Sequence, residues 1–304
     1  MILTYDNDSD AKALLDVQEV RSIGFHSSGV ALRQVIATFV DASKQSLLDV
    51  KVIENLDISL QGYVKESRIT RYDGLIDYDG VAGGLVPDSS RTVDEQVIKT
   101  ASFDLRGNAL EQKIVKSYFD TKTGSLVFSE AQAISTLDTY DIHNRAKESY
   151  IRSYTSSTFA AFKDEMQYIV YSKYDRFGNV EVQSIDTYTS IDIDINYQVD
   201  HKLIENTYTT LIAQRRGNAD ISVVTRSDKL GNLIDRSTTT TTRFNDFGYA
   251  IDQNVVSEVY SLGAFVKTEK RDIHNVSLDN RGDAETQTIK SYITDDDGSS
   301  YDLV

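Results

Sequence analysis

Hydrophobic and polar residues alternate along much of the chain with a period of two. In residues 185–199 the odd positions carry Ile, Thr, Tyr or Val, and the even positions are polar apart from Tyr188. Such alternation places one set of side chains on each face of a β-strand. It predicts a strand over 185–199. It also predicts strands with one wet, charged face over four further segments, residues 113–119, 147–154, 255–260 and 286–292.

A short phrase interrupts these strands repeatedly: an aromatic or apolar residue, Asp, two variable residues, Gly and often Asn. Residues 103–108 and 174–179 are the clearest copies, and 25–29 and 214–218 are looser ones. Asp accepts a hydrogen bond from the backbone two residues on, while Gly, and less readily Asn, adopts a positive φ. The phrase therefore predicts a hairpin turn. The predicted turn residues are Asp104, Gly107, Asp141, Asn144, Asp175, Gly178, Asp228, Gly231, Gly248, Asp279 and Gly282.

The turns recur at regular distances. Gly231 and Gly248 are 17 residues apart, and Gly248 and Gly282 are 34 apart, which is twice that unit. About 17 residues accommodate two short strands and two turns. We therefore predict an all-β fold of repetitive antiparallel hairpins in an extended, coiled or solenoid-like sheet. A β-propeller is the alternative, because spacings of 34 to 39 residues also suit blades of about 40 residues.

No change of composition marks a domain boundary. We expect a less regular N-terminal β region over residues 1–98, continuous with a hairpin-repeat region over 99–304. In the first region, Ser9 as an N-cap and a weak apolar side favour a short helix over residues 9–20 about as well as strand and turn. Pro87 is the only proline, which suits a long run of paired strands because proline cannot donate to a ladder.

The composition excludes several classes of protein. The 304 residues include no Cys, so there is no disulfide framework, thiol nucleophile or Cys-ligated metal. A formal net charge of −15 argues against a nucleic-acid partner. No run of about 18 apolar residues exists, so we expect no membrane insertion. The hydrophobic share of 40% is low for a large solid core and favours an extended or single-layer sheet.

The phrase with Tyr or Phe before its Asp resembles the tyrosine–aspartate (YD) repeats of the Rhs group. The residues that carry the resemblance are Tyr174, Asp175, Gly178 and Asn179, with a second good copy at 103–108. The resemblance spans roughly residues 100–300 and is specific only at the turns. It implies long β-sheets of strand–turn–strand units in shells or filaments of bacterial surface or secreted proteins. The Arg-Leu pair common after the Gly is missing, and no toxin-like terminal segment is visible.

Catalytic motifs are absent from the sequence. It contains no Gly-x-Ser-x-Gly elbow, His-Glu-x-x-His helix or phosphate-binding loop. The tetrapeptide Asp-Ile-His-Asn occurs twice and places His143 and His274 in what we interpret as exposed turns. Asp192 and Asp194 are interpreted as a solvated strand face and not as a glycosidase pair. The Thr run 238–242 is interpreted as a solvated strand. We expect no enzymatic activity.

Weak calcium candidates lie near the two ends of the chain. Acidic residues alternate near the N-terminus as in a calcium loop, but Ala11 and Val17 replace the Gly and Glu of an EF-hand. A second acidic group precedes Gly298. The candidates are Asp6, Asp8, Asp10, Asp295 and Asp297. We expect acidic turns that start hairpins, and no other cofactor.

Taken together, these features favour a non-enzymatic structural or adhesive module. Its partners would be like modules, joined by strand pairing or tandem stacking. A carbohydrate-binding or glycan-processing β-protein, contacting a surface glycan, is the alternative. The N-terminus has no basic region and no sustained apolar stretch, so we do not expect it to be a signal peptide. We expect a segment of a larger exported protein at the cell surface or outside the cell, or a cytoplasmic protein if the chain is complete.

Overall fold

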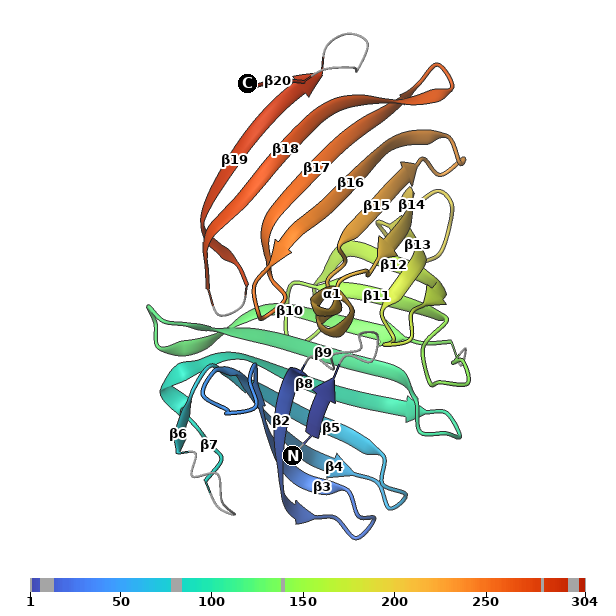
Figure 1. The fold of residues 1–304 in the computed structure, drawn as a ribbon. Coiled ribbons are helices and arrows are strands. Elements are labelled where there is room, and N and C mark those ends of the chain that lie inside the picture. The colour runs from blue at the N-terminus through green and yellow to red at the C-terminus, as the bar shows by residue number, and fades with distance from the viewer. Residues whose placement is uncertain are drawn as a thin grey trace. The chain divides into compact units, whose positions relative to one another are not determined.

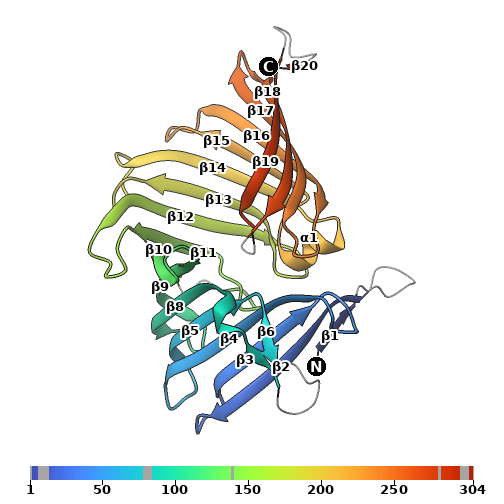
Figure 2. The same cartoon turned by 90° about the vertical axis from the view of Figure 1, so that its left-hand side faces the viewer.

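A computed structural model shows that the chain is built almost entirely of antiparallel strands (Figures 1 and 2). The predicted all-β fold of successive hairpins in an extended sheet is confirmed. The expectation of two short strands in each unit of about 17 residues is wrong, because the unit from Gly231 to Gly248 holds the single strand Leu233–Phe244. The chain divides into unit 1, Met1–Tyr140 with Tyr150–Lys163, and unit 2, Asp141–Ser149 with Asp164–Val304. The structure describes residues 2–5, 14–77, 84–137, 140–279, 282–294 and 301–303.

In unit 1, each long strand pairs with the next one along the chain. The strands of this ladder are β1 (Ile2–Tyr5), β2 (Leu14–Phe25), β3 (Ala31–Phe39), β4 (Leu47–Ile58), β5 (Val64–Tyr72), β8 (Thr92–Phe103), β9 (Ala109–Asp120), β10 (Ser125–Ser135) and the 150–154 part of β11 (Glu148–Tyr154). Between β5 and β8 the chain forms the small hairpin β6 (Leu75–Asp77) and β7 (Val86–Pro87), and then a 3₁₀ turn, Ser89–Arg91. Ile98 and Lys99, where the two predicted regions meet, are consecutive residues of β8.

Unit 1 has a compact apolar core on one face of its first strands. Val17, Val35 and Val50 are almost fully buried there, together with Phe39. Leu85, close to the β6–β7 hairpin, packs against this cluster. The small hairpin therefore gives this part of the sheet a second layer, as an amphipathic sheet requires.

Unit 2 continues the same strand-to-neighbour pattern. Its strands are the 164–174 part of β12 (Phe162–Tyr174), β13 (Val180–Tyr188), β14 (Gln198–Thr207), β15 (Ile221–Ser227), β16 (Leu233–Phe244), β17 (Ala250–Ser261), β18 (Ala264–Leu278), β19 (Ala284–Thr294) and β20 (Tyr301–Leu303). The helix α1 (Leu211–Arg216) connects β14 to β15. The ladder does not break into the four-stranded blades of the alternative propeller. No helix of the described residues has both the length and the apolarity needed to cross a membrane.

Most of unit 2 is a single layer. From Gln198 to Thr294, Ala213 of α1 is the only buried apolar residue among those that the structure describes. Ladder hydrogen bonds and cross-strand ion pairs hold these strands; Arg236 of β16 and Glu258 of β17, for example, are directly opposite each other and form a salt bridge. The expectation of a sheet without a large solid core is therefore met here.

Five hairpins share the same pairing register, including the position of a β-bulge. In each, a residue on the first strand pairs with the residue 12 positions later, and the register shifts by one residue just before the turn. The turn Gly lies seven positions after the first residue of the pair. The pairs are Asn55–Ser67, Thr100–Gln112, Tyr171–Gln183, Thr241–Gln253 and Asn275–Gln287. Such bulges increase the local twist of a hairpin.

The helix alternative for residues 9–20 is wrong from residue 14 onward. Residues 14–25 form β2, which pairs with β1 and β3 over most of its length. The apolar residue Val17 lies in the core of unit 1 opposite Phe39, so tertiary burial in a sheet decides the conformation. Residues 9–13 lie outside the described residues.

The looser turn copy at 214–218 is also wrong, because this segment ends α1. Thr210 caps the helix by accepting a hydrogen bond from Ala213 N at 3.3 Å. Gly217 terminates it with φ 77°, and its N–H donates to Ala213 O at 2.8 Å. The same Gly chemistry serves a helix C-cap and a hairpin turn, which explains the error.

The long strand predicted over 185–199 is broken in the middle. The chain leaves the ladder after Tyr188 and re-enters it at Gln198. Between them, Ser190 Oγ accepts a hydrogen bond from Asp192 N, and Asp194 Oδ1 accepts one from Asn196 N. These local bonds compete with the ladder and form a loop on which the isoleucines are about half exposed.

Candidate functional site

The predicted turns are built around one carboxylate. Asp175 Oδ1 accepts hydrogen bonds from Phe177 N and Asn179 N, both at 2.8 Å, and Asn179 Nδ2 donates to Asp175 Oδ2 at 2.8 Å. The backbone closes with Asp175 N to Asn179 O at 2.9 Å, while Gly178 adopts φ 91°. One side chain thus satisfies three donors of a turn that would otherwise need water.

The same turn recurs at Asp104 and Asp228. Asp104 Oδ1 accepts from Arg106 N and Asn108 N at 2.8 Å, and Asp228 Oδ1 accepts from Leu230 N and Asn232 N at 2.8 and 2.9 Å. The backbone closure is also present at Asp279, and it is retained where Asn245, His26 or Ser59 takes the position of the Asp. Gly107, Gly231, Gly248 and Gly282 all have φ between 82° and 90°.

Asp141 begins a turn of the same kind in which Asn144 takes the place of the glycine. Its Oδ1 accepts from His143 N and Arg145 N at 2.8 and 2.9 Å, and Asn144 adopts φ 61°. The Arg145 guanidinium bonds to Oδ2. The hydrogen bond from the Arg145 backbone N–H is the largest influence lowering the pKa of Asp141, to about 2, and the Arg145 side chain adds to it.

All of these turns except Asp228–Gly231 lie on one edge of their unit. In a meander of antiparallel strands, every second connection returns to the same edge. We call this the turn edge. In unit 1 it carries the β2–β3, β4–β5 and β8–β9 connections, and in unit 2 the Asp141 turn and the β12–β13, β14–β15, β16–β17 and β18–β19 connections.

The turns of unit 2 contact one another in sequence along this edge. Arg145 Nη1 donates to Asp175 O at 3.3 Å, and its guanidinium lies 4.6 Å from the Tyr174 ring centroid. Asn179 Nδ2 donates to Gln214 O of α1 at 2.7 Å. Beyond the helix, Asn218 Nδ2 donates to Gly248 O at 2.7 Å. Each turn therefore holds the next one.

The final contact of this series is steric. A Cβ at Gly282 would lie 2.6 Å from Tyr249 Cδ1, so the Tyr249 ring occupies the space beside the last turn. A Cβ at Gly248 would likewise meet the Arg216 side chain at 2.4 Å. At both turns glycine fits for two reasons: it adopts a positive φ without strain, and its lack of a Cβ leaves room for the side chain of the neighbouring turn.

Unit 1 repeats the arrangement with different side chains. Ser28 of the first turn would meet a Cβ at Gly62 at 3.2 Å, and Tyr63 would meet one at Gly107 at 3.0 Å. The Tyr63 ring also stacks on Phe103, with centroids 5.1 Å apart. The turn edge is thus a feature of both units.

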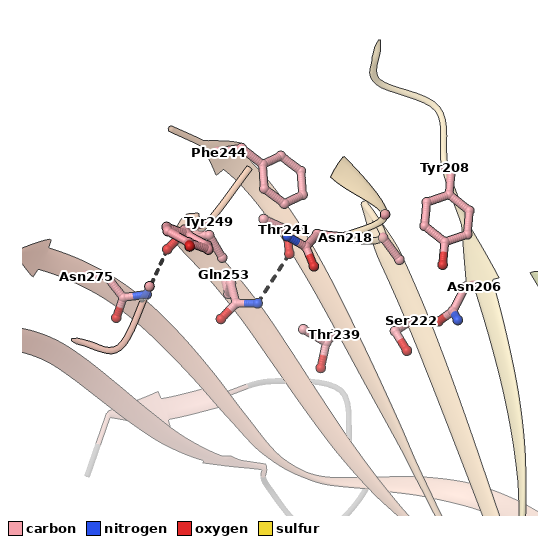
Figure 3. Close-up of a pocket in the computed structure, with 14 residues that line it drawn as sticks. Asn206, Tyr208, Asn218, Ser222, Thr239, Thr241, Phe244, Tyr249, Gln253 and Asn275 are labelled. Atoms are coloured by element: carbon pink, nitrogen blue, oxygen red, sulfur yellow. Dashed lines mark hydrogen bonds between the residues drawn. The ribbon is translucent and has the colours of Figure 1, made fainter. Parts of the chain in front are cut away.

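A polar hollow of about 520 Å³ lies beside the turn edge of unit 2 (Figure 3). It extends over strands β14 to β18 and the segment after α1. Figure 3 shows Asn206, Ser222, Thr239 and Gln253 projecting from four consecutive strands. The described lining residues are Asn206, Tyr208, Gly217, Asn218, Ala219, Ser222, Thr239, Thr241, Phe244, Tyr249, Ala250, Gln253, Asn275 and Gly282.

Several amides in the hollow are fixed by the register of the hairpins. Asn206 Nδ2 donates to Val180 O at 3.1 Å, and Asn275 Nδ2 donates to Ala250 O at 2.8 Å. Gln253 Nε2 donates to Thr241 Oγ1 at 3.2 Å. The backbone carbonyls accept only from an amide nitrogen, so the side-chain orientations of Asn206 and Asn275 are determined.

The repeated tetrapeptide Asp-Ile-His-Asn adopts two different structures. Residues 141–144 form the turn described above, but residues 272–275 lie within β18, so the expectation of a second turn is wrong. His274 Nδ1 instead lies 2.6 Å from Asp252 Oδ1 on the neighbouring strand. His201 of β14 and Asp186 of β13 form the same cross-strand pair at 2.7 Å.

The remaining candidates form no common site. The calcium candidates Asp6, Asp8, Asp10, Asp295 and Asp297 lie outside the described residues. Among the residues that are described, no group of three or more His, Asp or Glu side chains could hold a metal ion. Asp192 and Asp194 lie in the β13–β14 loop and not on a strand. The Thr run does form strand, in β16, but Thr239 and Thr241 line the hollow, and Thr241 is buried.

Sequence reasoning missed the turn at Ser59 and the position after each turn glycine. Ser59 Oγ accepts from Tyr63 N at 3.0 Å in the place of an Asp carboxylate. In three turns the side chain of the residue after the glycine contacts the next connection on the turn edge. These residues are Tyr63, Asn179 and Tyr249. The Gly-Tyr and Gly-Asn pairs are visible in the sequence and are the signal that could have identified these contacts.

The chain matches no protein-family model, and no curated protein sequence matches it significantly.

Proposed function

We propose that this chain is a non-enzymatic structural or adhesive repeat module that associates with further copies of itself. The observation that carries the proposal is the turn edge. Hydrogen bonds such as that from Asn179 Nδ2 to Gln214 O, at 2.7 Å, join successive connections along the ladder. A molecule in which each hairpin is held mainly by its neighbours is typical of repeat scaffolds.

The resemblance to YD repeats supports the same function and suggests the cellular setting. Tyr174 and Asp175 carry the tyrosine–aspartate pair, and the ring of Tyr174 lies against Arg145 of the preceding turn. In this proposal the module belongs to a bacterial surface or secreted protein, as YD-repeat proteins do. Digestion of intact source cells with an added protease tests this: removal of the chain, with a cytoplasmic marker retained, supports it, and full protection argues against it.

The outer strands suggest how copies associate. β20 pairs only with residues 292–294 of β19, so residues 284–291 have no neighbouring strand on their outer side among the described residues. β1 pairs with residues 14–18 of β2 and leaves residues 20–25 similarly open within the described chain. Open edges of this kind template pairing with another chain.

The exposed side chains of these edges suit an interface. Ile289 of β19 is 50% exposed, and Phe25 of β2 is 63% exposed. Pairing of the β19 edge of one copy with the β2 edge of another is a head-to-tail contact, which can continue into a filament. Pairing β19 with β19 would instead stop at a dimer.

Sedimentation velocity over a series of concentrations tests the association. We expect the wild-type chain to form species larger than a monomer as its concentration rises. Ile289→Lys should shift the distribution towards monomer, because a charge on an edge strand opposes pairing. Ile193→Lys is the matched control, since Ile193 is 52% exposed but lies in a loop.

A chain that stays monomeric up to its solubility limit would contradict the self-association. So would association that Ile289→Lys and Ile193→Lys weaken equally, because the contact would then not be at the edge strand.

A further inference from the structure

We infer that the polar hollow beside the turn edge of unit 2 binds a neutral oligosaccharide. The inference does not depend on self-association, because the hollow is lined within one chain and its described lining includes no residue of β19. It goes beyond the scaffold role, since it gives one stretch of the repeat a ligand.

The charge of the hollow selects against ions. None of its fourteen described lining residues is Asp, Glu, Lys, Arg or His, although such residues make up about a quarter of the chain. Charged side chains of opposite sign usually supply much of the affinity of a site for an anion or a cation. The net charge of −15 further disfavours anionic ligands. An uncharged ligand therefore suits this surface best.

The hydrogen-bonding groups of the hollow are oriented in advance. Asn206 and Asn218 donate their amide nitrogens to the backbone carbonyls of Val180 and Gly248. Their side-chain carbonyl oxygens are left as acceptors held in a fixed direction. Hydroxyl groups of Ser222 and Thr239, which are directly opposite each other, can both donate and accept. This combination matches the many hydroxyl groups of a sugar, and a preorganised site loses little entropy on binding.

Aromatic rings stand at the turn end of the hollow. Figure 3 shows Tyr208, Phe244 and Tyr249 there, above the polar side chains of the strands. The face of an aromatic ring is electron-rich, so it attracts the weakly positive C–H groups on the flat side of a pyranose ring. The Tyr249 ring stacks parallel to Phe247, with centroids 5.9 Å apart, and lies against Gly282, so it forms a fixed wall of the hollow. Tyr208 and Phe244 are the rings proposed to stack on a sugar.

The dimensions fit an oligosaccharide. A volume of about 520 Å³ lies within the range of about 300–1,000 Å³ found for small-ligand sites. The lining strands β14 to β18 are separated by four steps of about 4.8 Å, which gives a span of about 19 Å. The polar groups therefore repeat along the hollow at a distance close to the length of one sugar residue.

Isothermal titration calorimetry with cellotetraose, maltotetraose, tri-N-acetylchitotriose and a polygalacturonate oligomer tests the inference. We expect at least one of the three neutral oligosaccharides to bind, and the anionic polygalacturonate not to bind. Thr239→Val removes one hydroxyl from the hollow and should weaken binding about fivefold, as expected for one lost hydrogen bond. Thr240→Val is the matched control, because Thr240 is the next residue of the same strand and faces the other side of the sheet.

A second variant blocks the hollow. Ser222→Tyr should abolish binding while the far-ultraviolet circular dichroism and melting temperature stay close to those of the wild type. Three results would overturn the inference: no heat from any of the neutral sugars, tighter binding of polygalacturonate, or equal effects of Thr239→Val and Thr240→Val. If Ser222→Tyr disturbs the fold, the comparison of the two threonine variants still decides the question.

Discussion

The ring of Tyr249 lies where a side chain at position 282 would have to be. A Cβ on Gly282 would come within 2.6 Å of Tyr249 Cδ1 and Cε1. These residues belong to successive turns on the turn edge, 33 positions apart in the sequence. The glycine is thus required by its own positive φ and by the neighbouring turn.

Alanine at Gly282 should therefore cost more than alanine at a glycine with a similar φ and open space. Gly231 provides the comparison, because its φ is 86° and a Cβ added there would have no neighbouring atom within 4 Å. Gly231→Ala should lower the free energy of unfolding by about 1–2 kcal/mol through backbone strain alone. Gly282→Ala should lower it further, as measured by urea denaturation.

Removal of the Tyr249 ring tests the cause. If the extra loss comes from the clash, Tyr249→Ala should bring the effect of Gly282→Ala down to that of Gly231→Ala. Equal effects of the two glycine variants in the wild-type background would contradict the stacking of these turns.

The hydrogen bond between the β12–β13 turn and α1 has a similar test. Asn179 and Asn232 each donate Nδ2 to the Asp of their own turn at 2.8 Å, and Asn179 also donates to a neighbouring connection, at Gln214 O. Asn179→Ala should destabilise the chain by about 1 kcal/mol more than Asn232→Ala in chemical denaturation. A smaller loss for Asn179→Ala than for Asn232→Ala would be inconsistent with coupling between turns.

We expect the carboxylate of Asp220 to stabilise the start of α1. It is 6% exposed and accepts hydrogen bonds from the backbone N–H groups of Thr209 and Thr210 and from both hydroxyls. Burial raises its pKa, but these hydrogen bonds, Thr210 foremost, outweigh burial and hold the pKa below its ordinary value. Asp220→Ala leaves the donors unpaired and should cost about 1–3 kcal/mol of stability. Asp192→Ala, in an exposed loop, should cost little in the same thermal melts.

The turn carboxylates should make the fold sensitive to acid. The backbone N–H of Arg145 is the main cause of the lowered pKa of Asp141, about 2, and the Asn232 side chain is the main cause of the lowered pKa of Asp228. The unfolded value is about 3.9. Their stabilisation is therefore complete above about pH 4 and is lost as pH falls towards 2.

The melting temperature should accordingly fall between pH 4 and pH 2. Asp141→Asn should melt lower than the wild type at pH 7 but lose less on acidification, because one of the titrating groups is gone. Parallel pH profiles for the two proteins would contradict the role of Asp141.

Much of the turn architecture was accessible from sequence because its determinants are local. The Asp of each phrase bonds the backbone two and four residues on, so a window of five residues specifies the turn, as at Asp104 and Asp175. The Ser59 turn escaped because hydroxyl and carboxylate acceptors are interchangeable in this geometry. The sequence pattern required Asp, whereas the turn itself requires only a side-chain oxygen that accepts a hydrogen bond.

Features decided by distant residues could not be predicted in this way. Asp-Ile-His-Asn is a turn at 141–144 and a strand at 272–275, where Asn275 donates to Ala250 O and His274 meets Asp252 across the ladder. The isoleucines of 189–197 alternate as in a strand, yet local side-chain hydrogen bonds lift that segment out of the ladder. Local pattern alone does not reveal which competing hydrogen bonds prevail.

The polar hollow was hidden for a related reason. Its groups come from strands β14 to β18 and the segment after α1, so their meeting depends on the register of several hairpins. The Thr run of β16 stands out in the sequence by its β propensity, but the Asn and Gln residues that share the hollow with it are scattered from position 206 to 275. Only the common pairing of residues 12 positions apart brings Thr241 and Gln253 together.

Amide hydrogen exchange of the Asp175→Ala variant, followed by mass spectrometry, tests the central claim most directly. If the chain is a scaffold of neighbour-coupled hairpins, loss of the Asp175 turn should speed exchange in β12–β15 and leave β17–β19 close to the wild-type rates. An equal acceleration across all strands of unit 2 would show one cooperative structure and contradict the account.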